Sequence, residues 1–223
     1  MPESDVAVNL VVIDDHPLFR RGVADLIQMS DRLHLSGCAS SGAEGVALVR
    51  TQKPALVLLD LNMKGMSGID TLKAIKALDV DSRVVMLTVS DHEDDVTAAL
   101  RAGADGYLLK DMEPEDILTH LEQAAAGRLT ISPRLTELLA RALRGLPPLT
   151  DALTARERDI LRLLATGRSN KLIASQLDIA EATVKVHVKS LLKKLRMRSR
   201  VEAAVWAVEN IERDSPSGKL KTP

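Results

Sequence analysis

The chain has 223 residues, of which 45% are hydrophobic and 27% are charged, and a formal net charge of −1. This composition is typical of a globular protein of about two domains, and no apolar run approaches the roughly 20 residues of a membrane-spanning helix. The polar start Met1–Asp5 does not resemble a secretory signal. A lone cysteine, Cys38, cannot form an internal disulfide, so we expect a cytoplasmic protein with Cys38 as a small hydrophobe beside a strand.

The charge is divided unevenly along the chain. Residues 1–127 contain 21 Asp/Glu and 11 Lys/Arg, a net of −10, whereas residues 154–213 contain 13 Lys/Arg and 7 Asp/Glu, a net of +6. An acidic half joined to a basic half predicts two separate tasks, and the basic half is compatible with nucleic-acid binding. Many basic faces are only solvated, so the asymmetry alone does not decide this.

The first half alternates short apolar segments with helical patterns. Such alternation predicts a parallel sheet with helices on both faces. The predicted strands are Val8–Ile13, Leu33–Gly37, Ala55–Leu59, Arg83–Thr88 and Asp105–Leu109, and the predicted helices are Pro17–Met29, Gly42–Thr51, Gly68–Leu78, Glu93–Arg101 and Pro114–Ala126.

The second half shows helical patterns only. A connector over residues 128–150 contains a possible helix, Pro133–Arg144, and ends in Gly145-Leu146-Pro147-Pro148. The helices predicted after it are Arg156–Ala165, Asn170–Leu177, Glu181–Leu195 and Arg200–Ile211, followed by a disordered tail, residues 214–223. We therefore expect an α/β domain over residues 1–127 and an all-α domain over residues 151–213.

Charged and polar residues stand where the predicted strands end. Asp14 and Asp15 follow the first strand, Asp60 the third and Lys110 the fifth, while Thr88 ends the fourth. Because the carboxyl ends of parallel strands meet at one edge of a sheet, we expect these side chains to lie together. Three carboxylates suit Mg²⁺, while a lysine and a hydroxyl can hold phosphoryl oxygens. The alternative is that the first two aspartates only begin a loop.

Three motifs carry a resemblance to a known domain. Val12-Ile13-Asp14-Asp15-His16-Pro17, Leu58-Leu59-Asp60-Leu61-Asn62-Met63 and Gly106-Tyr107-Leu108-Leu109-Lys110-Asp111 resemble the receiver domain of bacterial response regulators, over residues 8–126. The resemblance implies a five-stranded flavodoxin-like fold that is phosphorylated on an aspartate. His16 lies next to the expected pocket, but we do not predict a catalytic role for it.

The resemblance assigns a role to each motif residue. It implies that Asp60 accepts the phosphoryl group, that Lys110 contacts it, and that Thr88 and Tyr107 form the switch. It also implies a Mg²⁺ site made by Asp14, Asp15, Asp60 and the backbone carbonyl of Asn62. A rival hypothesis is a phosphotransferase or phosphatase with Asp60 as nucleophile, but such hydrolases commonly place a second acid where this chain has Asn62. A third is a constitutive DNA-binding protein with a vestigial receiver.

The basic half predicts a helix-turn-helix. Thr154 and Glu157 form a capping box, and Asp178-Ile179-Ala180 forms a tight turn before the helix Glu181–Leu195. Residues 182–201 contain seven Lys/Arg and no acid. On this helix the predicted buried face is Val184, Val188, Leu191 and Leu195, and a lysine ladder is formed by Lys185, Lys189 and Lys193. A DNA backbone would turn the repulsion within the ladder into binding.

A second resemblance covers this half. Leu153-Thr154-Ala155-Arg156-Glu157-Arg158, Asn170-Lys171-Leu172-Ile173-Ala174 and Thr183-Val184-Lys185-Val186-His187-Val188 resemble the DNA-binding domain of LuxR/FixJ type. The whole chain therefore resembles the NarL/FixJ family of two-component response regulators, which act as transcription factors rather than enzymes. This implies DNA contacts by Lys185, Val186 and Lys189, to which the lysine ladder adds Lys193. It also implies phosphorylation by a sensor histidine kinase, and homodimers on double-stranded DNA that pair through the last helix. The departure is Ala180, where relatives often place a hydroxyl cap.

Overall fold

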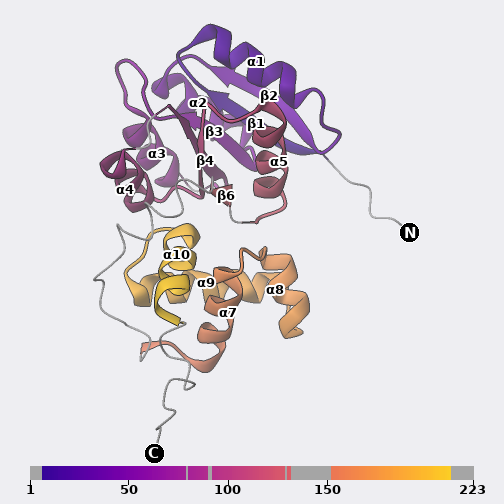
Figure 1. Cartoon of the computed structure of the whole chain (residues 1–223), viewed down its shortest axis with the longest axis vertical. Coiled ribbons are helices and arrows are strands. Elements are labelled where there is room, and N and C mark those ends of the chain that lie inside the picture. The colour runs from indigo at the N-terminus through magenta and orange to yellow at the C-terminus, as the bar shows by residue number, and fades with distance from the viewer. Residues whose placement is uncertain (1–6, 79, 90–91, 129, 132–151, 212–223) are drawn as a thin grey trace, which may run out of the picture.

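The computed structural model describes residues 7–78, 80–89, 92–128, 130–131 and 152–211. These residues form an α/β half and an all-helical half (Figure 1). The predicted helix Pro133–Arg144 and the predicted disordered tail lie outside the described residues.

The N-terminal half is built on one parallel sheet of six strands. The strand order is β2-β1-β3-β4-β5-β6, and the strands are β1 Val8–Ile13, β2 Leu33–Ala39, β3 Leu56–Asp60, β4 Arg83–Thr88, β5 Gly106–Leu109 and β6 Thr130–Ile131. All five predicted strands are present, and the expectation of a five-stranded sheet is corrected by β6. Two residues carry no alternation that could have revealed this strand. It is held by pairing of Thr130 with Gly106 and by the buried Thr130 hydroxyl, which donates to the His120 carbonyl at 3.3 Å.

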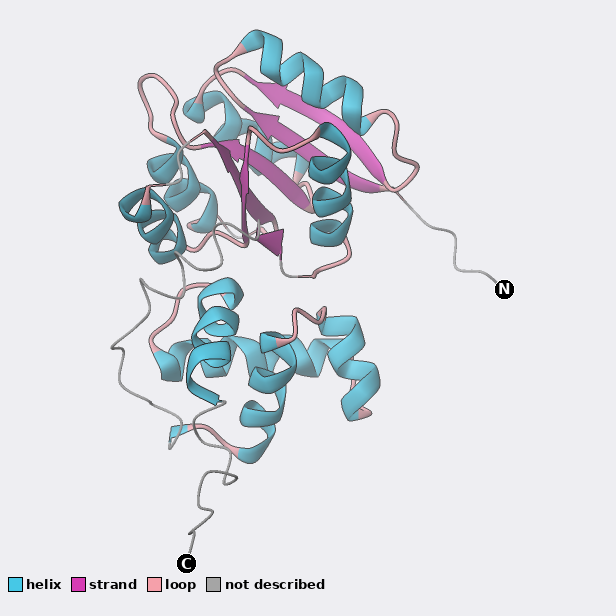
Figure 2. Ribbon diagram, viewed as in Figure 1, coloured by secondary structure: helices cyan, strands magenta, loops and turns pink. Residues whose placement is uncertain are grey.

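Five helices cover the two faces of the sheet (Figure 2). They are α1 Pro17–Ile27, α2 Gly42–Gln52, α3 Gly68–Lys76, α4 Glu93–Ala102 and α5 Pro114–Ala125. One apolar cluster joins α1 and α5 to the sheet through Ile27 and Leu121, and another joins α2, α3 and α4 to the opposite face through Val49, Leu72 and Leu100. Strands buried on both faces are continuously apolar, which is why the sequence showed them so clearly.

Cys38 differs from the prediction. Strand β2 continues to Ala39, two residues beyond the predicted end, so Cys38 lies within the strand instead of beside it. Its side chain is exposed, because β2 is an edge strand. Cys38 is therefore not a packed small hydrophobe.

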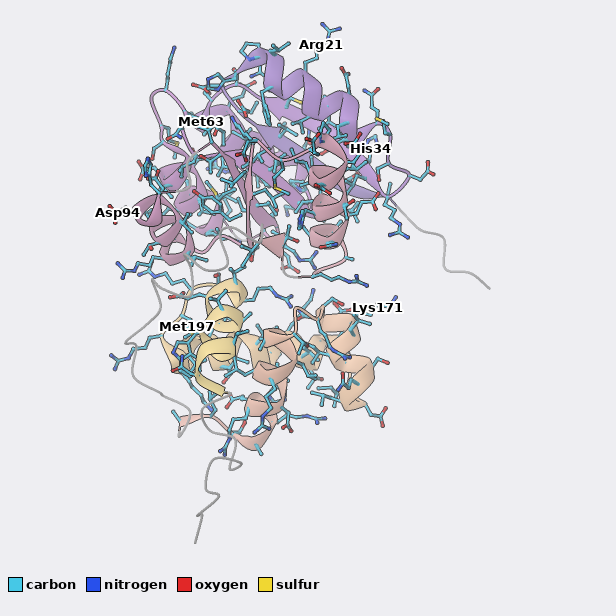
Figure 3. All side chains as sticks on the ribbon, in the orientation of Figure 1. Arg21, His34, Met63, Asp94, Lys171 and Met197 are labelled. Carbon is cyan, nitrogen blue, oxygen red and sulfur yellow. The ribbon has the colours of Figure 1, made fainter. Side chains whose placement is uncertain are left out.

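The C-terminal half contains α7 Ala155–Ala165, α8 Asn170–Leu177, α9 Glu181–Leu195 and α10 Arg200–Ile211. Asp178 has left-handed backbone geometry, with φ of 52°, and this ends α8 and begins the turn to α9. The core includes Leu161, Leu191 and Trp206, and Figure 3 shows side chains filling the space between these helices. In the predicted buried face of α9, Val188 is half-buried and the other three residues are buried.

The two halves are in contact. Helix α10 lies against α4 (Figure 1), and one apolar cluster runs from the α4 face of the sheet into the C-terminal helices. An ion pair joins Lys185 of α9 to Asp81, which precedes β4, at 3.1 Å. Within the part of the chain that the structure describes, every helix is too short or too polar to cross a lipid bilayer.

Candidate functional site

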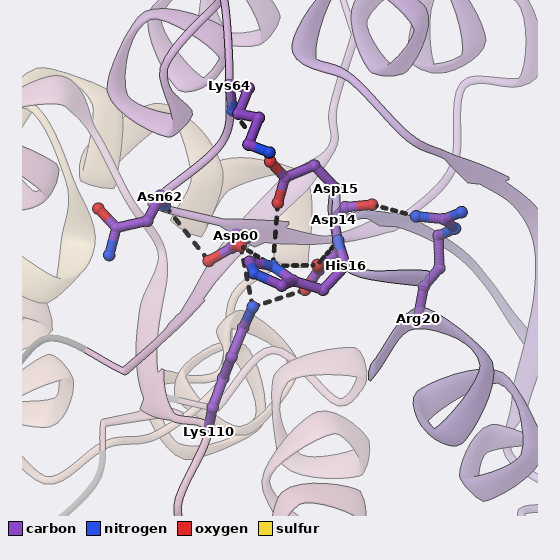
Figure 4. A network of polar contacts seen from close by, with 8 residues as sticks. All are labelled: Asp14, Asp15, His16, Arg20, Asp60, Asn62, Lys64 and Lys110. Atoms are coloured by element: carbon purple, nitrogen blue, oxygen red, sulfur yellow. Dashed lines mark hydrogen bonds and ion pairs between the residues drawn. The ribbon is translucent and has the colours of Figure 1, made fainter. Parts of the chain in front are cut away.

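The predicted acidic pocket forms at the carboxyl edge of the sheet (Figure 4). Asp14 follows β1, Asp60 is the last residue of β3, and Lys110 follows β5. The Lys110 Nζ lies 2.7 Å from Asp14 Oδ2 and 2.9 Å from Asp60 Oδ2. Both carboxylates are almost completely buried, so the lysine provides the positive charge that such groups require.

His16 points into this pocket instead of merely lying beside it. Its Nδ1 lies 2.9 Å from Asp15 Oδ1, 3.4 Å from Asp14 Oδ1 and 3.7 Å from Asp60 Oδ2. One candidate ligand atom from each of the four residues lies within 4.8 Å of the others. His16 thus contacts all three acidic groups while its side chain remains largely exposed.

Backbone N–H groups fix the orientation of the carboxylates. The Asn62 N–H donates to Asp60 Oδ1 at 3.3 Å, and the Lys64 N–H donates to Asp15 Oδ2 at 3.0 Å. The His16 N–H donates to Asp14 Oδ1 at 2.8 Å. The loop after β3 therefore holds two acidic groups that come from different strands.

The donor set fits a hard divalent cation. Burial raises the pKa of the Asp60 carboxyl, the nearby Lys110 opposes this shift, and the charge of Asp14 adds to it. Three carboxylates crowded together repel one another, and an oxygen-coordinated cation relieves that repulsion. Asp14, Asp15 and Asp60 could therefore hold Mg²⁺.

Thr88 and Tyr107 lie on one face of the sheet near this edge. Thr88 ends β4 and pairs with Leu109 of β5. Tyr107 of β5 pairs with Met86, which lies two residues before Thr88 on β4. Both side chains are buried on the face that α3 and α4 cover. The Lys110 N–H donates to the Thr88 carbonyl at 2.8 Å, so the backbones of these two residues are joined directly at the pocket.

Two residues of α1 complete the pocket, and neither was predicted from the sequence. The Phe19 ring lies under Lys110, with Nζ 4.5 Å from the ring centroid. The Arg20 Nη1 donates to the Asp14 carbonyl at 2.5 Å. The sequence did hold a signal for them. A phenylalanine and an arginine fall on the first turn of a helix that begins at Pro17, two residues after Asp15.

The predicted DNA-contacting side chains lie together on α9. Lys185, Val186, Lys189 and Lys193 are all exposed, including the apolar Val186 at 67%. The structure brings Lys185 to Asp81 of the α/β half, at 3.1 Å. Helix α9 begins at Glu181 although Ala180 supplies no side-chain cap, as the sequence predicted.

A buried glutamate ties α9 to the rest of its half. Glu157 forms the predicted capping box with Thr154, and its carboxylate also accepts from Ser190 at 2.7 Å and lies 2.7 Å from Lys194 Nζ. Burial alone would raise the pKa of Glu157, but the bonds from Lys194, Thr154 and Ser190 hold it at about 2. The lysine-rich helix is thus anchored through a charged network.

The N-terminal half carries an acidic pocket at the carboxyl edge of a doubly wound parallel sheet, and the C-terminal half is a helix-turn-helix with a basic face. This combination defines a response regulator. The family described as "Response regulator receiver domain" matches residues 10–122, and "Bacterial regulatory proteins, luxR family" matches residues 151–207. The chain belongs to this family of two-domain, DNA-binding response regulators, which regulate transcription under the control of phosphorylation.

Named relatives agree with this assignment. The chain is 53% identical to the nitrate/nitrite response regulator protein NarL of Escherichia coli K12 over 201 residues, covering 88% of this chain and 93% of the relative. It is 45% identical to NarP of the same strain, with coverage of 92% and 96%. Among solved structures, the receiver domain of a response regulator NarL from Mycobacterium tuberculosis matches with a TM-score of 0.53 and 36% identity, covering 55% of this chain and 98% of that one.

Proposed function

We propose that Asp60 accepts a phosphoryl group from a sensor histidine kinase and that this controls binding of double-stranded DNA by α9. A carboxylate oxygen of Asp60 attacks phosphorus, the P–N bond of the phosphohistidine breaks, and the imidazole leaves with the bonding pair and takes up a proton. The observation that carries the proposal is the buried Asp60 carboxylate, which lies beside Asp14 with Lys110 at 2.9 Å.

The surrounding residues would each serve this transfer. Asp14, Asp15, Asp60 and the Asn62 carbonyl would hold Mg²⁺, which when bound neutralises charge on the attacking and transferred oxygens. Lys110 would move from Asp60 Oδ2 to a phosphoryl oxygen. His16 would leave the acidic cluster to make room for the cation.

The switch would act through the α4 face of the sheet. Phosphorylation adds roughly −1.5 to −2 charges and strong acceptor oxygens, toward which the Thr88 hydroxyl would move. Tyr107 lies buried on the same face and would fill the space that Thr88 leaves. Because α4 contacts α10, a rearrangement of this face would loosen the contact between the two halves.

DNA binding would use the exposed face of α9. Lysines at 185, 189 and 193 would contact phosphates and guanine edges, with Val186 against a base. In the structure Lys185 is paired with Asp81, which supports a closed form in which the receiver, residues 1–127, covers part of this face. The domain of residues 151–213 would then be released by phosphorylation, through the linker 128–150, to form homodimers through α10 on paired half-sites.

The stimulus is proposed from relatives. The names of the two Escherichia coli proteins describe nitrate/nitrite response regulators, and we extend that stimulus to this chain. A cytoplasmic location is proposed because a DNA-binding regulator works where the DNA is. An enzymatic alternative would need repeated turnover of a phosphoester. Asn62 in place of a second acid, and a basic helix-turn-helix that turnover does not use, both favour a regulator.

The test is DNA affinity before and after phosphorylation. The intact protein with Mg²⁺ is titrated onto a candidate promoter, with and without acetyl phosphate, beside Asp60→Ala. The control is Asp25→Ala, which removes an exposed carboxylate of α1. We expect tighter binding after treatment in the wild type and in the control but not in Asp60→Ala. Equal binding in every sample would remove the switch, and steady release of phosphate from a generic phosphoester would favour the enzyme.

A further inference from the structure

Phe19 is the single phenylalanine of the chain, and it lies against the amine of the pocket lysine. We infer that Phe19 is a positioning residue for phosphoryl transfer, because its ring holds the Lys110 ammonium over Asp14 and Asp60. The inference rests on the proposed function of this pocket. It adds to the reaction a residue that never touches the phosphoryl group.

The ring itself is held firmly. Pro17 fixes the first turn of α1, and Arg20 ties that turn to the β1 end by its bond to the Asp14 carbonyl at 2.5 Å. Phe19 and Met112 are both half-buried and pack against the apolar cluster under α1 and α5. The ring is therefore a rigid surface placed by the same helix that steadies Asp14.

The lysine, in contrast, depends on its surroundings for its position. Its four-carbon stem has several rotatable bonds, and its ammonium has three donors. Two carboxylates engage it at 2.7 and 2.9 Å, and the ring centroid lies 4.5 Å away. Only 9% of its side chain is exposed, so little water competes for the ammonium.

Chemistry makes that position matter. When the phosphoryl group arrives on Asp60, the carboxylate becomes an uncharged acyl group, and the ammonium must move from Asp60 Oδ2 to a phosphoryl oxygen. A contact between a cation and a ring face favours the bound position by roughly twofold in equilibrium constant at an exposed site and by roughly thirtyfold where water is excluded. The contact with the Phe19 ring does not depend on which oxygen the ammonium binds. It can therefore persist through this change and keep the ammonium inside the pocket.

The test compares ring-keeping and ring-removing variants of the full-length protein. Acetyl phosphate with Mg²⁺ donates to Asp60, whose oxygen attacks phosphorus while the P–O bond to the acetyl group breaks and acetate leaves. The rate of Asp60 phosphorylation, followed by intact mass over a range of donor concentrations, is measured for Phe19→Leu and Phe19→Tyr. Leu18→Ala, at an 86% exposed neighbouring position, is the control.

We expect Phe19→Leu to lower the second-order rate constant about five- to tenfold, while Phe19→Tyr and Leu18→Ala stay within about twofold of the wild type. In a Lys110→Ala background, Phe19→Leu should cost nothing further, because the group it positions is gone. Thermal unfolding of each variant checks the fold. If Phe19→Leu does not fold, Phe19→Met replaces the ring with another apolar side chain.

Two results would overturn the inference. One is a wild-type rate in the Leu variant. The other is an equal loss on Phe19→Leu with and without Lys110, which would make the ring a packing residue only. A wild-type protein that acetyl phosphate does not modify on Asp60 would instead overturn the proposed function, and this inference with it.

Discussion

Gly68 controls how closely α3 approaches the end of β3. A Cβ added there would lie 2.2 Å from the Asp60 carbonyl oxygen and 2.6 Å from Leu61 Cα, both backbone atoms that cannot move aside. The Gly68 N–H also donates to the Leu61 carbonyl at 2.9 Å. The missing side chain thus sets the position of the backbone that carries Asp60.

Replacement of Gly68 by alanine should therefore damage both stability and chemistry. We expect Gly68→Ala to lower the free energy of unfolding by about 1–3 kcal/mol, as overpacking does, and to slow phosphorylation of Asp60. Urea unfolding and the acetyl phosphate assay would measure the two effects. Gly22→Ala is the matched control, because a Cβ at Gly22 meets nothing within 4 Å and an alanine in a helix gains stability. Equal stability of the two variants would contradict this account.

The sequence predicted the pocket residues because each one follows or ends a strong apolar strand. Asp14, Asp60 and Lys110 lie together as expected, whereas the roles of Thr88 and Tyr107 as a switch remain predictions. Phe19 and the inward direction of His16 were missed, because both depend on how the first turn of α1 is directed across the sheet edge. Strand order and turn direction are tertiary properties, and no local pattern encodes them.

At the scale of elements, α9 depends on one carboxylate from α7. Glu157 accepts a bond from Ser190 and pairs with Lys194, both on α9. The side chain of Glu157 is 3% exposed, so its charge is balanced inside the domain and not by water. This network fixes α9 relative to α7.

Acid should weaken this half of the molecule. The pKa of Glu157 is about 2 in the folded state against an ordinary 4.5, so its contribution to stability is present above about pH 4.5 and is lost as the pH falls toward 2. Between pH 7 and pH 3 the loss should be on the order of 1–2 kcal/mol. Urea unfolding between pH 7 and pH 3, followed by fluorescence of the buried Trp206, would measure it. In Glu157→Gln the protein should be less stable at pH 7 and depend less on pH; an unchanged slope would assign the effect to another group.

Most element boundaries could be predicted from the sequence. Strands β1 and β4 and helices α8, α9 and α10 have the predicted ends, because caps, glycines and apolar patterns mark them. Helix α1 ends at Ile27, two residues early, with Met29 77% exposed, because an apolar residue extended the predicted pattern without packing. Strand β6 escaped because only pairing with β5 defines it.

At the scale of the whole molecule, the contact between Asp81 and Lys185 couples the two halves by charge. The Asp81 side chain is 91% exposed and that of Lys185 is 50% exposed, so the pair itself is weak, on the order of 0–1 kcal/mol. The pair nevertheless engages Lys185, which we propose contacts DNA. A small change in this contact should therefore appear in DNA affinity.

Reversal of the charge at this contact should favour the open form. We expect Asp81→Lys to raise the DNA affinity of the unphosphorylated protein about two- to fivefold, and to have a smaller effect after phosphorylation. Asp25→Lys makes the same change of charge on α1 and controls for general attraction to DNA. Fluorescence anisotropy with labelled promoter DNA at fixed salt would compare them. Equal gains in both variants would mean that the contact does not restrain α9.

The apolar cluster that continues from the receiver into the C-terminal helices has a thermal consequence. Separation of the halves would expose part of this surface to water, and exposure of apolar surface increases the heat capacity. The hydrophobic contribution to the closed form therefore weakens on cooling. The balance between closed and open molecules should shift with growth temperature even when no aspartate is phosphorylated, so the same promoter would be occupied more readily in a cold cell than in a warm one.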